Sequence, residues 1–369
     1  MTNQSAKRVV LPIMLMSVIL ASNLLAGIAI AQNLLVSTTV SSFGTVSYTP
    51  INSKVANTLP TTGFGADYCL WYNDGPISAW TSSGWLDKVE YWATRGFPTV
   101  HLHFEFIDST VLPGYSVLDY TKFDELLGLM DGVGVTVIAT VFQSSHGSTW
   151  QEGYIGSDSW RNSWIEFVTY YKDDPRISAI RLFGEPTDNG EDHNYWHPSL
   201  DTPQKKADAC ASLITTLHAI DHDRVIVFPY GLFTINAARN NYLKAPEWIA
   251  AIKNTGVQNN PYVIYDISHP YFFENQWDFG LSPSEKALWY KTNEFEPFIA
   301  AFGADKCWVG ETFWWPNLTP TLQDEWVTSI VNVCDDLRLS FSLHASLSNN
   351  AFYDGAVYAL SQSDYIVTP

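Results

Sequence analysis

The sequence predicts one α/β domain folded as a (β/α)8 barrel, the TIM-barrel architecture. Short apolar stretches of strand-favouring residues alternate with longer stretches of helical spacing, and we count eight such strands between about residues 62 and 344. No glycine-rich phosphate loop follows the first strand, which disfavours a doubly wound open sheet. The predicted strands are Phe64–Trp71, Thr99–Phe106, Val135–Phe142, Ser178–Gly184, Val225–Pro229, Tyr262–His269, Cys307–Glu311 and Leu339–His344.

The segments between these strands have the spacing of amphipathic helices. A barrel of roughly 250 residues plus loops accounts for residues 61–369, so one large core is sufficient. The predicted helices include Asp119–Met130, Trp160–Tyr171, Thr202–Ile220, Pro283–Ala300 and Leu322–Leu337.

The N-terminal residues have the order of a secretory signal. Lys7 and Arg8 precede an apolar run that ends at Ile30, and small residues lie just before Gln32. We expect residues 1–31 to be a signal peptide, or a membrane anchor if they are not cleaved, and the Ser/Thr-rich residues 32–60 to be a tether. The protein is therefore predicted to be secreted, or attached to the cell surface by an uncleaved anchor.

The composition indicates a neutral partner. A net charge of −18 with only 20 Lys and Arg residues argues against binding nucleic acid, which requires concentrated positive charge. Charged residues make up 16% of the chain, below the roughly 25% of an average globular protein. Aromatic residues reach 15%, with 15 tryptophans. Carbohydrate-active proteins use flat rings to stack on sugars, although some of these rings will fill the core.

The four cysteines give no sign of a metal or redox motif. No CxxC or Cys/His metal spacing is present. Cys69 and Cys307 lie in predicted strands, and Cys210 and Cys334 lie in predicted helices, where buried free thiols are common. We predict no disulfide.

Glu311 is the first candidate for chemistry. The period of two in a strand predicts that Cys307, Val309 and Glu311 point to one side, and that Trp308 and Gly310 point to the other. Glu311 is expected at the C-terminal tip of this strand, which is the catalytic face of a parallel barrel. The alternative is an exposed carboxylate at a strand end with no function.

Polar residues gather on the second predicted strand. His101, His103 and Glu105 share one face by the period of two. Two imidazoles and a carboxylate can bind Zn²⁺, but the fifth predicted strand adds no ligand. Hydrogen bonding to substrate or to neighbouring carboxylates is the alternative that we favour, and a purely structural role also stays open.

Two further strand ends supply partners for Glu311. The fourth predicted strand is followed by Glu185, a second carboxylate at a strand tip. The sixth ends at His269-Pro270-Tyr271, where the proline marks the exit into a loop. A phenol or imidazole donor near a carboxylate favours its ionised form, as a nucleophilic Glu311 needs.

Tryptophans near the predicted strand ends are candidates for stacking on sugar rings. For each one alone, packing in the core is an equally good explanation. They are Trp71, Trp150, Trp196, Trp277, Trp314 and Trp315.

Four motifs, in this order along the chain, resemble those of glycoside hydrolase family 5, the retaining cellulases and mannanases. That family is a barrel with its acid on the fourth strand and its nucleophile on the seventh. The motifs are Gly96-Phe97-Pro98-Thr99-Val100, Phe183-Gly184-Glu185-Pro186, His269-Pro270-Tyr271 and Val309-Gly310-Glu311.

The resemblance implies a role for each matching residue. Glu185 becomes the general acid/base and Glu311 the nucleophile, Tyr271 holds Glu311, and His269 supports the pair. No cofactor or metal is implied. The chain departs from the family pattern where the strand-two Arg falls at His101 and the Asn before the acid falls at Gly184. We count His101 and His103 among the supporting residues.

The predicted function is that of a secreted retaining endo-β-1,4-glucanase acting on a β-linked polysaccharide. A β-mannanase or an exo-β-glycosidase would use the same two carboxylates. Two alternatives belong to other classes of protein. One is a metal-dependent hydrolase built on His101 and His103, and the other is a carbohydrate-binding protein without catalysis.

Overall fold

A computed structural model describes residues 64–69, 86, 89–90, 93, 99–104, 120–141, 155–184, 196–230, 245–272, 280–314 and 319–344. All of them belong to the unit Pro50–Pro369. The predicted signal segment and tether lie outside the described residues, so the domain boundaries remain predictions. Glu185 and Glu105 also lie outside them, as do Trp71, Trp150, Trp277 and Trp315. The backbone alone is described for His103, Tyr271 and Trp314.

Eight parallel strands form a closed ring, which confirms the predicted barrel. Each strand pairs with the next along the chain except that β6 pairs with β8, and β9 returns to pair with β1. Every strand predicted from the sequence is present. The ring consists of β1 (Phe64–Cys69), β2 (Thr99–Phe104), β3 (Thr136–Val141), β4 (Ile177–Arg181), β5 (Val225–Phe228), β6 (Val263–Asp266), β8 (Cys307–Trp314) and β9 (Ser340–His344).

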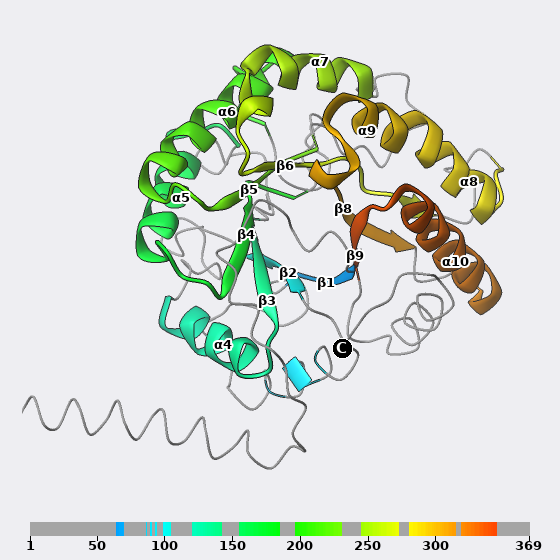
Figure 1. The fold of residues 1–369 in the computed structure, drawn as a ribbon, viewed down its shortest axis with the longest axis horizontal. Helices are drawn as coiled ribbons and strands as arrows, with labels where there is room; N and C mark the ends of the chain where they lie inside the picture. The colour runs from blue at the N-terminus through cyan, green and yellow to red at the C-terminus, as the bar shows by residue number, and fades with distance from the viewer. Residues whose placement is uncertain are drawn as a thin grey trace, which may run out of the picture. The chain divides into compact units, whose positions relative to one another are not determined.

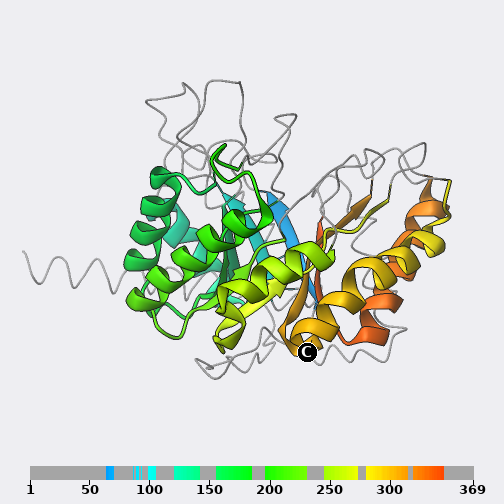
Figure 2. The same ribbon diagram turned by 90° about the horizontal axis from the view of Figure 1, so that it is seen from above.

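Helices surround the ring, as Figures 1 and 2 show. They are α4 (Tyr120–Gly132), α5 (Asp158–Tyr170), α6 (Pro203–Ile220), α7 (Ala245–Thr255), α8 (Pro283–Tyr290), α9 (Glu296–Phe302) and α10 (Pro320–Leu337). Where the sequence predicts one helix from Pro283 to Ala300, a π-helical turn, Lys291–Phe295, separates α8 from α9. None of the described helices combines the length and the hydropathy that a membrane span requires.

Helix starts are fixed by side chains that the sequence supplies at the right place. Ser157, Thr202, Ser282 and Thr319 each accept a hydrogen bond from a backbone N–H in the first turn of α5, α6, α8 and α10. Proline follows three of these caps, where its missing N–H costs nothing. These signals explain why the helix boundaries are close to those predicted.

The strands divide the core into two parts. Outward-facing strand residues pack against the helices in one large cluster. The inward-facing residues Ile138, Ala179, Val227, Ile264 and Trp308 form a second, small cluster inside the ring. Such filling makes the barrel interior a packed core.

Three of the cysteines belong to the outer part of the core. Cys210, Cys307 and Cys334 are buried free thiols, and burial raises their pKa values. Cys307 lies in a strand, and Cys210 and Cys334 lie in helices, as predicted. The side chain of Cys69 is outside the described residues.

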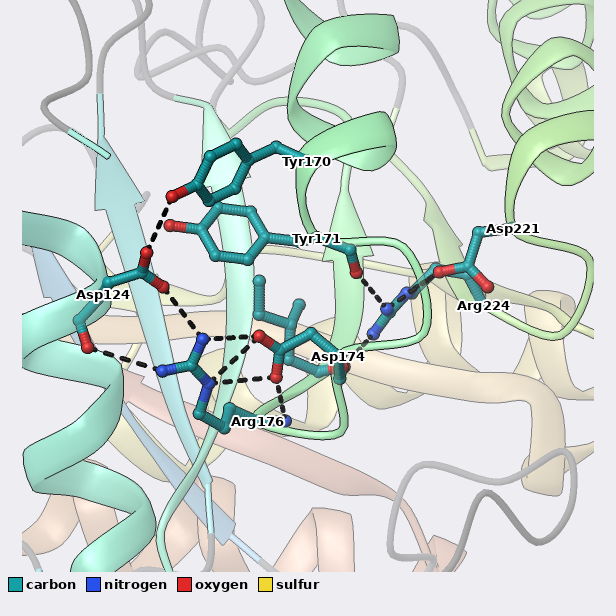
Figure 3. A network of polar contacts seen from close by, with 8 residues as sticks. Asp124, Tyr170, Tyr171, Asp174, Arg176, Asp221 and Arg224 are labelled. Carbon is teal, nitrogen blue, oxygen red and sulfur yellow. Dashed lines mark hydrogen bonds and ion pairs between the residues drawn. The ribbon is translucent and has the colours of Figure 1, made fainter. Parts of the chain in front are cut away.

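A polar network lies where the chain enters β4 and β5 (Figure 3). Arg176, just before β4, bonds Asp124 of α4 at 2.8 Å and Asp174 at 2.6 Å. Arg224, just before β5, donates to Asp221 at 2.9 Å and to the carbonyl oxygens of Tyr171 at 2.9 Å and Asp174 at 3.1 Å. These contacts lie at the N-terminal end of the strands, where barrel residues serve stability.

Replacement of Arg224 by Met should lower the free energy of unfolding by roughly 2–4 kcal/mol, because it leaves Asp221 and several carbonyls without their donor. Asp221 is 5% exposed, so water cannot replace the donor fully. Urea denaturation would measure the change. The control is Lys205→Met, which removes a surface ion pair to Asp201 and should cost less than about 1 kcal/mol. Equal losses in both variants would contradict the role assigned to Arg224.

Candidate active site

A buried polar cluster lies inside the ring and is centred on Arg181, the last residue of β4. Its Nη1 donates to Oε1 of Glu311 on β8 at 2.5 Å and lies 3.4 Å from Nε2 of His101 on β2. Its Nη2 contacts Oδ2 of Asp266 on β6 and Nε2 of His269, which follows β6. These five residues are 0–4% exposed. Four strands therefore meet at one guanidinium.

The floor of the cluster is aromatic. The guanidinium carbon of Arg181 lies 5.7 Å from the ring centroid of Trp308, close enough for a cation–π attraction. His101 meets the same indole edge to face, at 5.1 Å and 72°. Nε2 of His101 also contacts the hydroxyl of Thr140 on β3. Trp308 thus separates the polar cluster from the apolar residues deeper in the barrel.

Asp266 is the ionised partner of Arg181 in this cluster. Burial acts to raise the pKa of Asp266, but the charges of Arg181 and His269 and their hydrogen bonds lower it further, so the net shift is downward. Nε2 of His269 lies 2.8 Å from Oδ2 of Asp266. When this nitrogen carries a proton it can donate to Asp266, and when it is unprotonated it can accept from Arg181.

Glu311 lies within its strand and not at the tip that the sequence predicted. Strand β8 continues past Glu311 to Trp314. Its last residues pair with a short strand, β7 (Tyr271–Phe272), which begins after the turn at Pro270. The sixth predicted strand ends at Asp266, before His269 and Pro270, and the residues directly after the proline form β7 where the sequence predicted a loop. Glu311 is buried, at 1% exposed.

The side on which Glu311 lies also differs from the prediction. Cys307 and Val309 face the helices and Trp308 faces the interior, as a period of two requires. The register then shifts, because Val309 and Thr312 are three residues apart but face partners on β9 that are two apart. This bulge puts Glu311 in the interior, in contact with Arg181. The prediction that Glu311 shares a face with Cys307 and Val309 is wrong.

Gly310 allows the close approach of β8 to Asp266. Its N–H donates to Oδ1 of Asp266 at 3.1 Å. A Cβ at this position would lie 2.7 Å from Oδ1 and 2.8 Å from both Cγ and Oδ2 of Asp266. The carboxylate therefore occupies the space of the missing side chain.

Replacement of Gly310 by Ala should destabilise the fold by roughly 1–3 kcal/mol, because the buried carboxylate of Asp266 must move. The move also weakens the bonds from Asp266 to Arg181 and to the backbone. Chemical denaturation checks the stability. Gly128→Ala on α4 is the control, since no heavy atom lies within 4 Å of a Cβ there. A Gly310→Ala variant as stable as the Gly128→Ala variant would rule out this packing constraint.

The structure brings together three of the predicted site residues. Glu311, His101 and His269 all contact Arg181, and His269 also contacts the carboxylate of Asp266. Tyr271 is placed by its backbone beside Phe313 of β8. His103 lies on β2 two residues after His101. The roles of Tyr271 and His103 stay predictions.

The chain segment that leads to Glu185 is firmly anchored. After β4, the carbonyl oxygen of Leu182 accepts hydrogen bonds from the indole N–H groups of Trp160 at 3.3 Å and Trp164 at 2.9 Å. Leu182 and Phe183 are fully buried. The backbone is thereby fixed at Leu182 and Phe183, the second of which lies two residues before Glu185 in the sequence.

Trp196 is a core residue, and its prediction as a sugar platform is wrong. It is 5% exposed, and its ring packs edge to face on Phe183 at 4.9 Å and against Trp248 at 6.4 Å. The ammonium of Lys206 lies 5.3 Å from its ring centroid. Because its faces are covered by protein, this indole cannot stack on a sugar.

Sequence reasoning did not single out Arg181 and Asp266. Both are charged residues in otherwise apolar strands, and fully buried charges occur almost only in pairs. Each also lies two residues after an inward-facing apolar residue, Ala179 and Ile264 respectively. A charged residue on the inward-facing side of an apolar strand was therefore the signal by which Arg181 and Asp266 could have been found.

Within the described part of the chain, no group of three His, Cys, Asp or Glu side chains is arranged to hold a metal ion. The imidazole of His101 faces the guanidinium of Arg181 and the hydroxyl of Thr140. The metal hypothesis on His101 and His103 therefore gains no support from the side chain that the structure describes.

The carboxyl of Glu294 is buried and bonds to Ser268, the residue that precedes His269. Glu294, in the π-helical turn, is 1% exposed and accepts a hydrogen bond from Ser268. Burial raises the pKa of Glu294 from 4.5 to about 8, against the lowering effect of a hydrogen bond from Tyr230. Glu294 is therefore mostly protonated at neutral pH.

The raised pKa of Glu294 makes stability depend on pH. Since the folded state keeps a proton that the unfolded chain releases above 4.5, the free energy of unfolding should fall as pH rises from 4.5 to about 8. A Glu294→Gln variant lacks this titration. Its stability relative to wild type should rise across this range by a few kcal/mol, on the order of 1.4 kcal/mol per unit of pKa shift.

Denaturation curves at the two ends of this range test that expectation. Glu296→Gln, which changes an exposed carboxylate two residues away, is the control and should follow the wild type at both ends. A constant difference between Glu294→Gln and wild type would show that Glu294 does not titrate as described.

Solved structures of other proteins share this fold. An endo-1,4-β-mannanase from Rhizomucor miehei is 14% identical over 82% of this chain and 95% of its own, with a TM-score of 0.54. A broad specificity GH5-4 endoglucanase from Clostridium acetobutylicum is 13% identical over 82% and 97%, also at 0.54. An endocellulase from Pyrococcus horikoshii, solved with cellotetraose, is 13% identical over 81% and 92%, again at 0.54. No protein-family profile and no curated protein sequence matches the chain. At these identities the likeness establishes the (β/α)8 fold.

Proposed function

We propose that the barrel is a secreted retaining endo-β-1,4-glucanase in which Glu311 is the nucleophile and Glu185 the general acid/base. The observation that carries this proposal is the bond from Arg181 to Glu311, which joins residues 130 positions apart in the sequence. Arg181 ends the fourth strand of the ring, and Glu185 follows four residues later. Glu311 lies on the seventh strand of the ring. This is the strand placement of the two carboxylates in the family that the sequence resembles.

The electrostatics of the cluster suit a nucleophile. A guanidinium in contact with Glu311 favours the charged carboxylate. The chain has His101 where the family pattern has an arginine on the second strand, and Arg181 supplies a guanidinium from the fourth. The positive charge that the family pattern places on the second strand is thus supplied here by Arg181 on the fourth.

The reaction would proceed in two steps. The Glu311 carboxylate attacks the anomeric carbon, the glycosidic C–O bond breaks, and Glu185 gives its proton to the leaving oxygen. Glu185 then takes a proton from water, whose oxygen attacks the same carbon and releases Glu311. This retaining chemistry requires the two carboxyl groups to be about 5–5.5 Å apart, whereas an inverting pair would be roughly 6.5–9.5 Å apart.

The fold neighbours and the composition support the proposed substrate class. Proteins that share the fold include endoglucanases and a mannanase. The aromatic content and the low number of basic residues support a neutral polysaccharide. A β-linked glucan is our first choice and a mannan the second, because the two carboxylates serve either substrate.

Release of reducing sugar from soluble cellulose and from mannan tests the proposal. Glu185→Gln should lower the rate about 10²- to 10⁴-fold, the usual contribution of a general acid/base. Glu311→Gln should abolish turnover, because an amide cannot form the glycosyl ester. Glu325→Gln, an exposed change on α10, is the control and should keep the wild-type rate.

Other outcomes assign the alternatives. Equal activity in wild type, Glu185→Gln and Glu311→Gln would remove both residues from the mechanism. Loss of activity on adding a chelator would favour the metal-dependent hydrolase on His101 and His103. Binding of oligosaccharide without release of reducing ends would identify a carbohydrate-binding protein.

A further inference from the structure

Glu294 is a buried acid for which the proposed mechanism has no direct use. It comes from the π-helical turn between α8 and α9, a deviation that is often found at functional sites. Burial of a carboxyl is costly unless its hydrogen bonds are made inside the protein. Ser268 and Tyr230 make them here.

Both partners of Glu294 flank His269. Ser268 directly precedes His269 in the chain, after the end of β6. Tyr230 follows β5, is 4% exposed, and places its ring centroid 5.9 Å from that of His269. The carboxyl of Glu294 therefore bonds to the residue that precedes His269 and to the tyrosine whose ring lies next to its imidazole.

The same imidazole lies one contact away from the guanidinium that binds Glu311. His269 contacts Arg181 and lies 2.8 Å from Oδ2 of Asp266. The path of contacts runs from Glu294 through Ser268 and Tyr230 to His269 and then to Arg181. Each member in this path is less than 5% exposed.

Titratable groups lie close to the Glu294–Tyr230 pair. Tyr230 bonds to Glu294, and Tyr290 of α8 and Asp266 act on Tyr230 through their charges. His269 lies beyond Tyr230. Burial is the larger effect on Glu294 and favours its neutral carboxyl. A neutral hydrogen-bonding role fits these surroundings better than an ion pair.

We propose that Glu294 is a positioning residue, which orients His269 through Ser268 and Tyr230 and thereby sets the geometry of Arg181 at Glu311. The assignment rests on the proposed function insofar as Glu311 is the nucleophile. It predicts that the hydrogen-bonding capacity of Glu294 matters and that its negative charge does not.

The first test reads His269 directly and needs no enzymatic activity. Imidazole NMR signals are compared at pH 6.5, where Glu294 keeps its proton, in wild type, Glu294→Ala, Glu294→Gln and the exposed control Glu296→Gln, with His269→Asn used to assign the signal. Glu294→Ala should shift the His269 resonance, while Glu294→Gln and Glu296→Gln should stay close to wild type. A His269 signal in Glu294→Ala that superimposes on that of the wild type would overturn the proposal.

The second test measures turnover on soluble cellulose. Glu294→Ala should lower kcat by roughly 10- to 100-fold, the scale on which small misplacements act, with KM within about twofold of wild type. Glu294→Gln should restore most of kcat. Unchanged kcat in Glu294→Ala, or equal loss in the Ala and Gln variants, would refute the positioning role.

Two more variants cover the case in which Glu294→Ala does not fold. Ser268→Ala and Tyr230→Phe each remove one hydrogen bond to the carboxyl and should both shift the His269 signal and lower kcat. Wild-type behaviour in both would overturn the proposal. If the wild type releases no sugar from any substrate, the proposed function fails, and the NMR test alone still decides whether Glu294 orients His269.

Discussion

The burial of the Arg181 guanidinium is the interaction on which the rest of the site depends. A fully buried cation costs several kcal/mol unless neighbouring groups replace its water, and here two carboxylates and two imidazoles do so. Asp266 and Glu311 come from two different strands, β6 and β8. Removal of either would leave one positive charge with a single negative partner in the barrel interior. The cluster therefore couples four strands of the ring by electrostatics as well as by backbone pairing.

The bulge in β8 is the backbone counterpart of this charge cluster. A regular strand would place Gly310 inside and Glu311 among the helices, where a carboxylate has no partner. One extra residue brings both to the interior, and the missing side chain of Gly310 makes room for Asp266. The carboxylate of Asp266 accepts hydrogen bonds from the Gly310 N–H and from Arg181. These bonds connect β8 to β6 at the residue directly before Glu311.

The sequence was sufficient for the architecture because barrel strands are apolar on both faces and are separated by capped amphipathic helices. It was insufficient for the site in two ways. The period of two assigns faces only while the register is regular, so the bulge at Gly310 reversed the side of Glu311. The period of two also does not give the position of a residue along the barrel axis, which depends on the stagger between strands. Trp196 could not be assigned from sequence, because its partners Phe183 and Trp248 come from other segments.

The position of Arg181 has a consequence for how the two carboxylates would work together. The residue that binds Glu311 is the last of β4, and the same segment continues, held at Leu182 by two indoles, to Glu185. An arginine on the second strand would bind the nucleophile independently of the strand that leads to the acid. Here the segment that contacts Glu311 through Arg181 is the one that continues in the sequence to Glu185. In the proposed mechanism, a shift of β4 would therefore alter the environment of Glu311 and the approach of Glu185 together. The spacing on which a two-step displacement depends would then be set chiefly by the anchoring of this single strand.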